Sequence, residues 1–357
     1  MAPDAEKVEP LCAIFNECGG CSYQHISYAN ELKVKEMMLK SLLDQHIPAV
    51  SELCEPIVAS PKAYYYRNRI DLKLIQTRAK KIFIGFTPKE GRGVIPIESC
   101  AIADRAILDA IVGLKEKVQD KLTFKYRQAN IEIKTGDDGR VYWGGIGRKS
   151  LRLDSKDYLW TEINGKKIFY SLDTFFQANL SILPLVIEAV RSLDCWGDTT
   201  TFYDVYGGVG LFGISLADKA AKVILIEDNL ASIKLAHFNR EFHGASHLEI
   251  CYAKAEEKLA EYLRDNGGSH QVIMVDPPRA GLSAEIRRLF TQTKGLTHLL
   301  YLSCNPETLA RDLKELISGE WRIQKIIPFD FFPKTKHLET FVVLVRKIKN
   351  GEMNARG

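Results

Sequence analysis

The stretch Leu299-Leu300-Tyr301-Leu302-Ser303-Cys304-Asn305-Pro306-Glu307-Thr308 joins an apolar run directly to a polar turn. The four residues from Leu299 to Leu302 predict a fully buried strand. Pro306, followed by Glu307 and an apolar periodicity that continues to Leu316, predicts a helix that begins at the proline. Cys304 is therefore expected between the end of a strand and the start of a helix, where functional groups of open α/β sheets collect.

The position of Cys304 favours a chemical role for its thiol. The N-terminus of a helix stabilises an anion, so we expect a lowered thiol pKa and a thiolate that can act as a nucleophile. The alternative is that Cys304 is a small buried hydrophobic residue, as most free cysteines are.

The second half of the chain alternates regularly between strand and helix patterns. Such alternation predicts a parallel sheet covered by helices. Before the Cys304 strand, we expect strands at 201–205, 222–226, 248–252 and 271–275, with helices from Gly210 to about Ala217 and at 229–242, 255–265, 283–292 and 306–317. Two final strands, 321–329 and 339–347, have no helix between them and predict a hairpin that closes the sheet edge.

The first half of the chain has a different texture. A helix is expected at 27–45, and alternating β-branched and aromatic runs with turn residues between them predict an antiparallel β-rich domain. Its expected strands are 70–75, 81–86, 130–135, 141–144 and 167–170, with one helix around 104–117 and a further helix at 181–193. We therefore expect three parts, residues 1–50, 51–170 and 171–357.

The composition describes an ordinary globular chain. It has 357 residues, of which 46% are hydrophobic and 26% charged, a length that suggests two or three domains. No apolar run is long enough for a membrane helix and the N-terminus lacks a signal pattern, so we expect a cytosolic protein without a membrane partner. The net charge of +4 says little about nucleic acid. Eight cysteines in a cytosolic protein suggest chemistry or metal binding rather than disulfides.

Three of these cysteines lie close together near the N-terminus. Cys12-x5-Cys18-x2-Cys21 encloses Gly19 and Gly20, which allow the backbone to fold tightly around a ligand held by the thiolates. Either tetrahedral zinc or a four-iron cluster requires a fourth ligand, and the available residues are Cys54, Cys100 and His25. The spacing does not separate zinc from iron and sulfur, and unrelated reduced thiols are the alternative.

Arginine and aromatic residues alternate at the start of the β-rich region, from Tyr64 to Arg69. This mixture suits stacking on bases and contact with phosphates. An ordinary solvated strand face explains the same residues equally well.

A glycine-rich loop and an acidic residue indicate a site for an adenosine cofactor. The strand that ends at Asp204 enters Tyr206-Gly207-Gly208-Val209-Gly210, and the next strand ends in Glu227. Glycines permit close approach of the backbone to a ligand, and the carboxylate can accept from both ribose hydroxyls. NAD is a rival, but the loop lacks the glycine spacing of a pyrophosphate turn, and the closing hairpin suits an S-adenosylmethionine methyltransferase better.

Asp276-Pro277-Pro278-Arg279 and Glu339 complete a site for carbon methylation. The rigid Asp-Pro-Pro turn holds a polar group against a flat substrate, and Arg279 stands where enzymes that methylate an exocyclic nitrogen often have an aromatic residue. A thiolate that adds to C6 of uracil activates C5 towards a methyl donor, and a base must then remove the C5 proton. Glu339 is the best candidate base, unless it is an ordinary exposed residue at a strand end.

Together these motifs resemble the RNA 5-methyluridine methyltransferase family, which includes 23S rRNA enzymes and the tRNA uridine-54 enzyme. The family's motifs occur here in order: Phe175-Phe176-Gln177-Ala178-Asn179, Asp204 to Gly210, Asp276 to Arg279, Ser303 to Pro306, and His337-Leu338-Glu339-Thr340. The resemblance implies a Rossmann-like class I methyltransferase sheet that uses S-adenosylmethionine.

The resemblance also implies roles for individual residues. Cys304 is the implied nucleophile and Glu339 the implied proton acceptor. The implied cofactor contacts are Gln177, Tyr206, Glu227 and Asp276, and the implied ligands of a [4Fe-4S] cluster are Cys12, Cys18, Cys21 and Cys100. From the residues alone, Gln177 and Asn179 fit a polar contact or a helix cap equally well.

Two departures from the family pattern matter. Many members have cysteine where Gly207 stands, and many begin with a small β-barrel RNA-binding domain of the TRAM type, which we expect to be absent because only eleven residues precede Cys12. RNA binding would then rest on the cysteine segment and the β-rich domain. We expect a monomer without an obligate protein partner, and 23S rRNA rather than tRNA as the substrate.

Two other functions compete with this interpretation. RNA 5-methylcytosine enzymes use related thiol addition but usually have a second cysteine after the proline where Arg279 stands here. A non-catalytic iron–sulfur RNA-binding protein would need neither Cys304 nor Glu339.

Overall fold

The computed structural model describes residues 7–119, 128–145, 158–265, 270–293 and 295–347. The chain forms two compact units, each built from separate stretches of sequence. The first unit comprises Met1–Lys35, Ala59–Pro184 and Asp330–His337, and the second comprises Glu36–Val58, Leu185–Phe329 and Leu338–Gly357. The units interleave along the chain, and the division into 1–50, 51–170 and 171–357 stays a prediction. No helix in the described ranges is long and apolar enough to cross a membrane.

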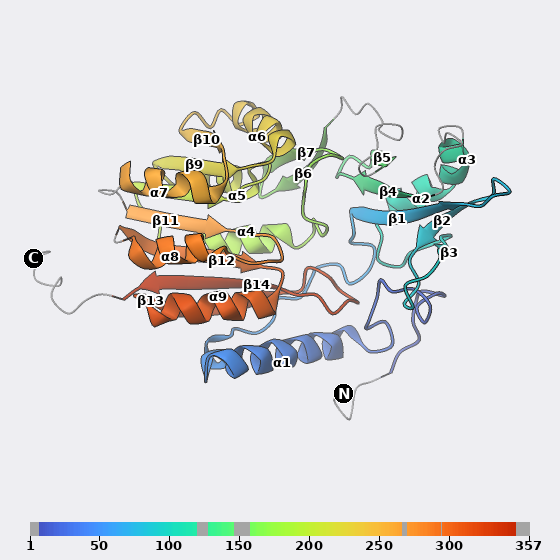
Figure 1. The fold of residues 1–357 in the computed structure, drawn as a ribbon, viewed down its shortest axis with the longest axis horizontal. Helices are drawn as coiled ribbons and strands as arrows, with labels where there is room; N and C mark the ends of the chain where they lie inside the picture. Colours follow the sequence, from blue (N-terminus) through green and yellow to red (C-terminus); the bar gives the residue numbers. More distant parts are fainter. Residues whose placement is uncertain (1–6, 120–127, 146–157, 266–269, 294, 348–357) are drawn as a thin grey trace, which may run out of the picture. The chain divides into compact units, whose positions relative to one another are not determined.

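The second unit contains a seven-stranded sheet in the order β10-β9-β8-β11-β12-β14-β13 (Figure 1). Its first five strands in sequence run parallel, and β14 is antiparallel to both β12 and β13. The predicted parallel sheet with a terminal hairpin is confirmed, with β13 at the edge. The strands are β8 (Thr200–Val205), β9 (Lys222–Glu227), β10 (Leu248–Tyr252), β11 (His270–Val275), β12 (Leu296–Ser303), β13 (Trp321–Phe329) and β14 (Glu339–Arg346).

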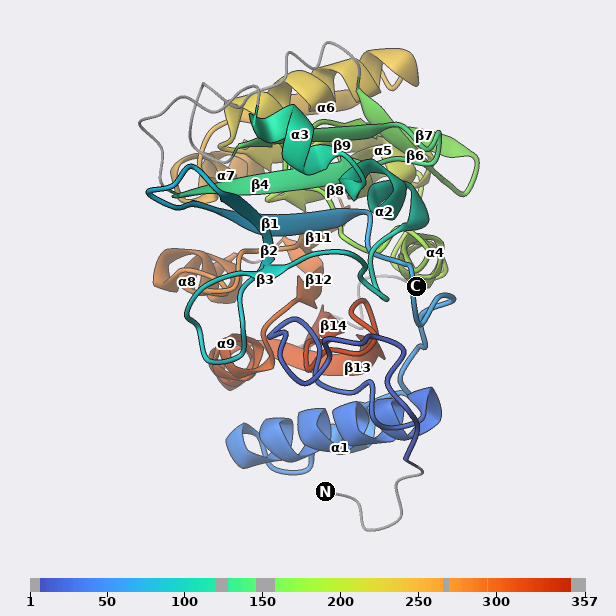
Figure 2. The same cartoon turned by 90° about the vertical axis from the view of Figure 1, so that its right-hand side faces the viewer.

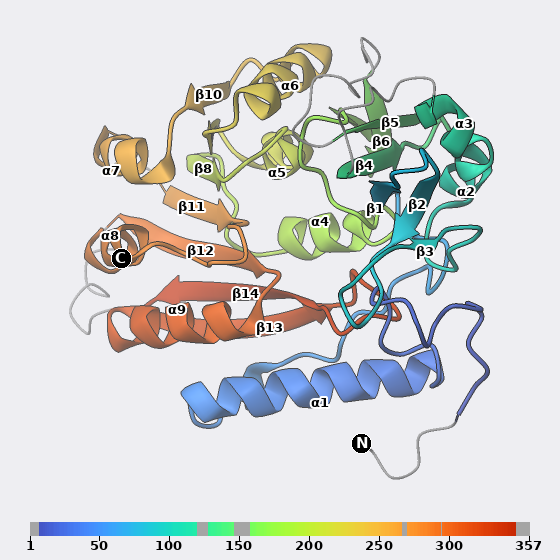
Figure 3. The same ribbon diagram turned by 45° about the vertical axis from the view of Figure 1, so that its right-hand side comes forward.

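Helices cover this sheet, most of them with one apolar stripe turned to the core, whereas every residue of α5 is buried. They are α5 (Leu211–Ser215), α6 (Leu230–Phe242), α7 (Ala255–Asp265), α8 (Ala284–Gln292) and α9 (Pro306–Ser318), with single 3-10 turns η1 (Val50–Leu53) and η3 (Ala217–Lys219). The unit boundaries fall within α1 (Tyr28–His46) and α4 (Leu183–Arg191). Helices α7, α8 and α9 follow one another along one face of the sheet (Figure 3).

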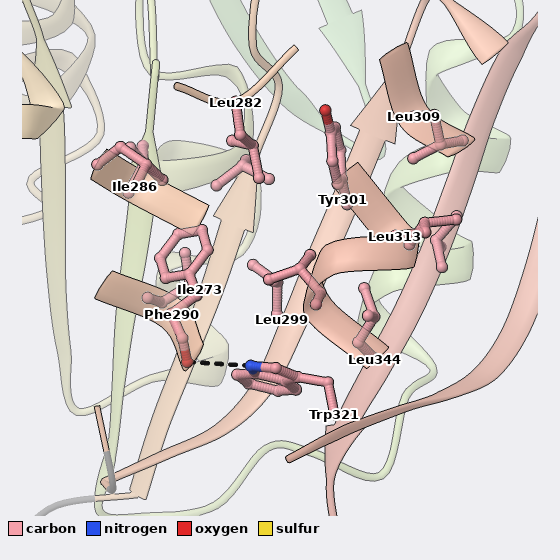
Figure 4. Packing of buried hydrophobic residues seen from close by; sticks show 14 of the residues in the cluster. Ile273, Leu282, Ile286, Phe290, Leu299, Tyr301, Leu309, Leu313, Trp321 and Leu344 are labelled. Atoms are coloured by element: carbon pink, nitrogen blue, oxygen red, sulfur yellow. Dashed lines mark hydrogen bonds between the residues drawn. The ribbon is translucent and has the colours of Figure 1, made fainter. Parts of the chain in front are cut away.

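A large core of the second unit lies between this sheet and α7, α8 and α9. Leu39 and Leu43 from the second half of α1 also belong to it. Trp321 is fully buried there, and its indole Nε1 donates to the backbone oxygen of Phe290 at 3.0 Å (Figure 4). The indole thus satisfies its one polar group inside an apolar core, as a buried tryptophan must.

The first unit is built on an antiparallel five-stranded sheet in the order β3-β2-β1-β4-β5, and Figure 2 shows β3, β2, β1 and β4 side by side. The predicted antiparallel β-rich region is confirmed, but β3 was not predicted and the predicted strand 167–170 belongs to a separate pair. The strands are β1 (Arg69–Gln76), β2 (Ile82–Phe86), β3 (Ile95–Pro96), β4 (Gln128–Thr135) and β5 (Val141–Gly145), with a separate pair β6 (Leu159–Ile163) and β7 (Lys166–Tyr170).

The single helix predicted around 104–117 is wrong. The segment forms two helices, α2 (Arg105–Ile111) and α3 (Leu114–Gln119). Gly113 between them has φ +80°, a left-handed conformation that glycine adopts without strain and that interrupts a helix.

Candidate active site

Cys304 and Glu339 lie on neighbouring strands at the same edge of the second unit's sheet. Strands β12 and β14 are antiparallel, with Ser303 opposite Thr340. The ladder ends at this pair, and Cys304 and Glu339 are the next residues on the two segments. The Glu339 carboxyl is near enough to raise the pKa of the Cys304 thiol. Pairing of the strands therefore brings together two residues that are 35 positions apart in the sequence.

The turn after β11 brings charged groups to the same place. Strand β11 pairs with β12 up to Val275 opposite Tyr301, so Asp276 emerges beside the end of β12. The backbone oxygen of Arg279 accepts hydrogen bonds from Asn305 Nδ2 at 3.1 Å and from Thr308 Oγ1 at 3.2 Å. These bonds fasten the Asp-Pro-Pro-Arg turn to the first turn of α9, directly after Cys304.

The expected lowering of the Cys304 thiol pKa is wrong. Burial, together with the nearby carboxyl groups of Glu339 and Asp276, raises the pKa to about 11, and the Arg279 guanidinium opposes this rise. The residue that caps α9 is Asn305, whose side chain accepts from the Glu307 N–H. The acids and the burial outweigh the helix terminus, so the resting thiol is protonated at neutral pH.

Glu339 is buried without being fully satisfied. The residue is 4% exposed, and its Oε2 finds no hydrogen-bond partner among the described residues. Burial raises its pKa well above the ordinary value, Asp276 adds to the rise, and Arg279 opposes it. A buried carboxyl with a free oxygen and a raised pKa is suited to accept a proton from a bound substrate.

A separate group of residues lines a cavity of about 530 Å³ at the ends of β8, β9 and β11. Tyr206 and Glu227, both implied as cofactor contacts, lie in its wall. The volume is in the range of small-molecule sites, and its place beyond the carboxyl ends of parallel strands is typical of cofactor sites in such sheets.

Backbone amides hold the Glu227 carboxylate in this cavity. Its Oε2 accepts from the Gly208 N–H at 2.9 Å, and its Oε1 accepts from Asn229 at 2.7 Å and Asp228 at 3.1 Å. These bonds lower the pKa of Glu227, but burial is the larger effect and raises it. Asp204, fully buried beneath the loop, has a pKa raised to about 7 by burial and accepts from the Gly213 N–H at 2.7 Å.

The residues around Gly207, where many family members have cysteine, leave little room for a side chain. A Cβ atom added at Gly207 would lie 2.7 Å from Leu225 Cγ and 3.0 Å from the backbone oxygen of Asp204. The Leu225 side chain fills the space that a larger residue would need. Tyr206 beside it has φ +63°, a strained conformation for a tyrosine, and this strain is typical of functional loops.

A buried acid that the sequence analysis did not single out supports the other wall of the cavity. Asp312 accepts from the Leu282 N–H at 2.8 Å and from the Tyr301 hydroxyl at 2.8 Å, and it pairs with Arg287 and Arg311. Both arginines line the cavity. Asp312 lies within an amphipathic helix pattern that gives no sign of a buried charge, so sequence alone could not identify it.

From the sequence, Arg279 serves only to argue against nitrogen methylation and against 5-methylcytosine enzymes, although its charge acts on both Cys304 and Glu339. Gln177 belongs to the first unit and is buried there. Its contact with a cofactor stays a prediction.

The four cysteines implied as cluster ligands share one cavity in the first unit. Cys12, Cys18, Cys21 and Cys100 all line a space of about 240 Å³. Burial raises the pKa of the Cys18 and Cys100 thiols, and it raises the pKa of Cys21 to about 11. Of the possible fourth ligands, Cys100 is in the wall, whereas Cys54 belongs to the second unit. Within the described ranges, no three His, Cys, Asp or Glu side chains are grouped to hold a single metal ion.

Comparison with known proteins identifies relatives along nearly the whole chain. A tRNA (uracil-(54)-C(5))-methyltransferase of Pyrococcus abyssi is 28% identical over 95% of this chain and 86% of its own length. A 23S rRNA (uracil(1939)-C(5))-methyltransferase, RlmD, of Haemophilus parainfluenzae is 28% identical over 97% of this chain and 84% of its own.

A solved structure agrees with these relatives. The crystal structure of the Pyrococcus abyssi tRNA (uracil-54, C5)-methyltransferase in complex with S-adenosyl-L-homocysteine is 26% identical, covers 92% of this chain and 86% of its own, and superposes with a TM-score of 0.70. The family model described as tRNA (Uracil-5-)-methyltransferase matches residues 145–347, more than half of the sequence. The chain therefore belongs to the tRNA (uracil-5-)-methyltransferase family.

Proposed function

We propose that the protein transfers a methyl group from S-adenosylmethionine to C5 of a uridine in RNA through a covalent bond between Cys304 and C6. The observation that carries this proposal is that Cys304 and Glu339 directly adjoin Ser303 and Thr340, the last facing pair of β12 and β14, and that Glu339 acts on the Cys304 thiol. A nucleophile and a proton acceptor on adjacent strands can reach C6 and C5 of the same pyrimidine ring. The family of the chain and the ligand of its structural relative agree with this chemistry.

The steps balance in bonds and protons. The Cys304 thiol first gives up its proton to solvent, its Sγ bonds to C6, and the electrons of the C5–C6 double bond move to C5. C5 would then take the methyl group as the bond between that group and the donor's sulfonium sulfur breaks, which would leave the donor as the neutral thioether, S-adenosylhomocysteine. Glu339 Oε2 then accepts the C5 proton, the double bond re-forms, and the Cys304 thiolate leaves. Arg279, whose charge favours both anions, stabilises the thiolate before addition and the carboxylate before proton removal. S-adenosylmethionine supplies the electrophilic methyl group when it is bound.

The cavity around Tyr206 and Glu227 is the proposed cofactor site. Its volume of about 530 Å³ fits an adenosine-containing ligand, and Glu227 is held in the wall at the end of β9. Asp276 is proposed to contact the cofactor and the base, because its charge acts on both Cys304 and Glu339. Gln177 is kept as a proposed contact from the motif alone.

We also propose that Cys12, Cys18, Cys21 and Cys100 hold a [4Fe-4S] cluster with a structural role. The residues fit such a group, because four thiols line one cavity. A cluster attaches each cysteine to a different iron and so needs the sulfurs farther apart than one zinc ion does. The preference for iron–sulfur over zinc rests on the family resemblance, since no three His, Cys, Asp or Glu side chains among the described residues are grouped to hold a metal ion. When bound, the cluster would cross-link residues 12–21 to residue 100.

The test is to map 5-methyluridine by mass spectrometry in rRNA and tRNA from cells with and without the gene. We expect one uridine to lose its methyl group in the deletion strain, in 23S rRNA rather than tRNA, and to regain it with purified protein and S-adenosylmethionine. Unchanged maps and no transfer in vitro would remove the proposed activity. Iron and sulfide analysis of anaerobically purified protein tests the cluster independently. The predicted cytosolic, monomeric state stays a prediction.

A further inference from the structure

The segment 330–337 connects β13 to β14 but belongs to the first unit, whereas both strands belong to the second. The ladder of the two strands ends where Phe329 lies opposite Glu339. Glu339 therefore follows this segment by two residues. Leu338 alone separates the segment from Glu339, so a short stretch of backbone joins the two.

Four buried charged side chains form an ion network at this segment. Glu31 and Lys35 come from α1, and Asp330 and Lys334 come from the segment itself, and each side chain is at most 2% exposed. Lys35 Nζ lies 2.9 Å from Glu31 and 2.7 Å from Asp330, and Lys334 Nζ lies 3.1 Å from Glu31. The two carboxylates and the two ammonium groups cancel in net charge. Burying four charges still costs free energy, so the network adds little net stability. A network of this kind is better suited to fixing one geometry than to raising stability.

The network also holds the backbone of the segment. The Lys334 N–H donates to Glu31 Oε1 at 2.6 Å, and Lys35 Nζ donates to the Phe332 oxygen at 3.0 Å. The Tyr66 hydroxyl donates to the Pro333 oxygen at 3.0 Å. Each of three consecutive residues is therefore tied to a buried side chain of the first unit.

Lys334 is the centre of this arrangement. Its φ of +68° is strained for a residue with a side chain, so the surroundings must impose it. Its ammonium lies 5.1 Å from the ring centres of both Tyr28 and Tyr64. Its backbone oxygen accepts from the N–H groups of Ser22 and Tyr23, the two residues after Cys21. One residue thus joins the cysteine segment to the chain that leads into Glu339.

We propose that Lys334 and Glu31 are positioning residues for Glu339, and that the buried ion network holds the base in register for removal of the C5 proton. This inference rests on the proposed function. A base must lie within hydrogen-bond reach of its proton, so a shift of under 1 Å in β14 slows that step. Addition of Cys304 and methyl transfer precede the step and should be affected less.

The test is the ratio of trapped adduct to turnover in Lys334→Met. Wild type and variant are mixed with S-adenosylmethionine carrying a tritiated methyl group and with unmodified transcripts of 23S rRNA and of tRNAs. Denaturing gels give the methylated RNA–protein adduct, and nucleoside analysis gives released 5-methyluridine. We expect the ratio to rise about tenfold in Lys334→Met, less than the roughly 10²- to 10⁴-fold effect of losing a general base, because Glu339 is displaced rather than removed.

Arg346→Met is the matched control. Arg346 lies at the other end of β14, pairs with Glu320 at 2.8 Å and donates to backbone oxygens of Thr291 and Thr293. We expect it to lose stability while keeping the wild-type ratio within twofold. If Lys334→Met does not fold, Tyr66→Phe, which removes only the bond to Pro333, replaces it with an expected rise of about threefold.

An unchanged ratio in the folded Lys334 variant, or in Tyr66→Phe when that variant replaces it, would overturn the inference. An equal rise in Arg346→Met would also overturn it, because general loosening of β14 would then explain the effect. Wild-type protein that forms neither adduct nor 5-methyluridine on any transcript would instead remove the proposed function.

Discussion

Two carboxyl groups of the second unit are held in contrasting ways. One is Glu227 at the end of β9, and the other is Glu339 at the start of β14. Three backbone N–H groups point at Glu227. Glu339 is more deeply buried, and its Oε2 has no hydrogen-bond partner in the described part of the chain. A carboxylate satisfied by amides is fixed as an acceptor for a ligand, whereas one left with a free oxygen can take up a proton. The difference separates a proposed binding group from a proposed catalytic one.

The largest expected effect comes from loss of the Cys304 thiol. Cys304→Ala should reduce 5-methyluridine formation by at least about 10⁴-fold, because no other group can add to C6. Binding of S-adenosylmethionine by calorimetry should stay within about twofold, since the Glu227 region is untouched. Retained turnover would remove the nucleophile assignment and with it the contrast between the two regions.

Glu339→Gln should lower turnover by about 10²- to 10⁴-fold, the usual effect of losing a general base. Because the thiol can still add, the methylated RNA–protein adduct should accumulate on denaturing gels. Loss of adduct and turnover in equal measure would instead place Glu339 in the binding of RNA or in folding.

Glu227→Gln should weaken S-adenosylmethionine binding by about ten- to a hundredfold and change turnover at saturation by much less. An amide nitrogen at either position must face a backbone N–H, since both carboxylate oxygens accept from amides. The measurement is KM against kcat with the cofactor varied. A fall in kcat alone would contradict the separation of roles.

The smallest expected effect concerns the pH dependence of the Cys304 thiol. Its pKa of about 11 means that alkylation by iodoacetamide should speed up about tenfold for each pH unit from 7 towards 10, as the thiolate fraction grows. Arg279→Gln removes the charge that lowers this pKa, so alkylation at pH 8 should slow about threefold. Peptide mass spectrometry resolves Cys304 from the other cysteines, and a rate that is flat with pH would contradict the raised pKa.

The order of strands and helices in the second unit could be predicted because each element carries its own pattern. Leu299 to Leu302 has the apolar run of a buried strand, and Pro306 marks the start of α9. The first unit was harder, because β3 has only two residues and Gly113 divides one helical pattern into two helices.

The site residues could be predicted from the sequence, but the shifts of their pKa values could not. The resemblance implied roles for Cys304 and Glu339, and the ladder of β12 and β14 ends at the pair of residues that adjoins them. The thiol pKa moved opposite to expectation because burial and two nearby acids depend on packing that no local pattern encodes. The buried network of Glu31, Lys35, Asp330 and Lys334 joins residues about 300 positions apart, and each of them looks like an ordinary surface charge in the sequence.

Trapping the covalent bond itself is the decisive measurement. RNA transcribed with 5-fluorouridine and mixed with the protein and S-adenosylmethionine should form an adduct that cannot resolve, because Glu339 cannot remove fluorine as it would a proton. After digestion, tandem mass spectrometry should find methylated 5-fluorouridine attached to the peptide that contains Cys304. Attachment to any of the other seven cysteines, or no adduct on RNA that the protein methylates when it carries uridine, would contradict the proposed mechanism.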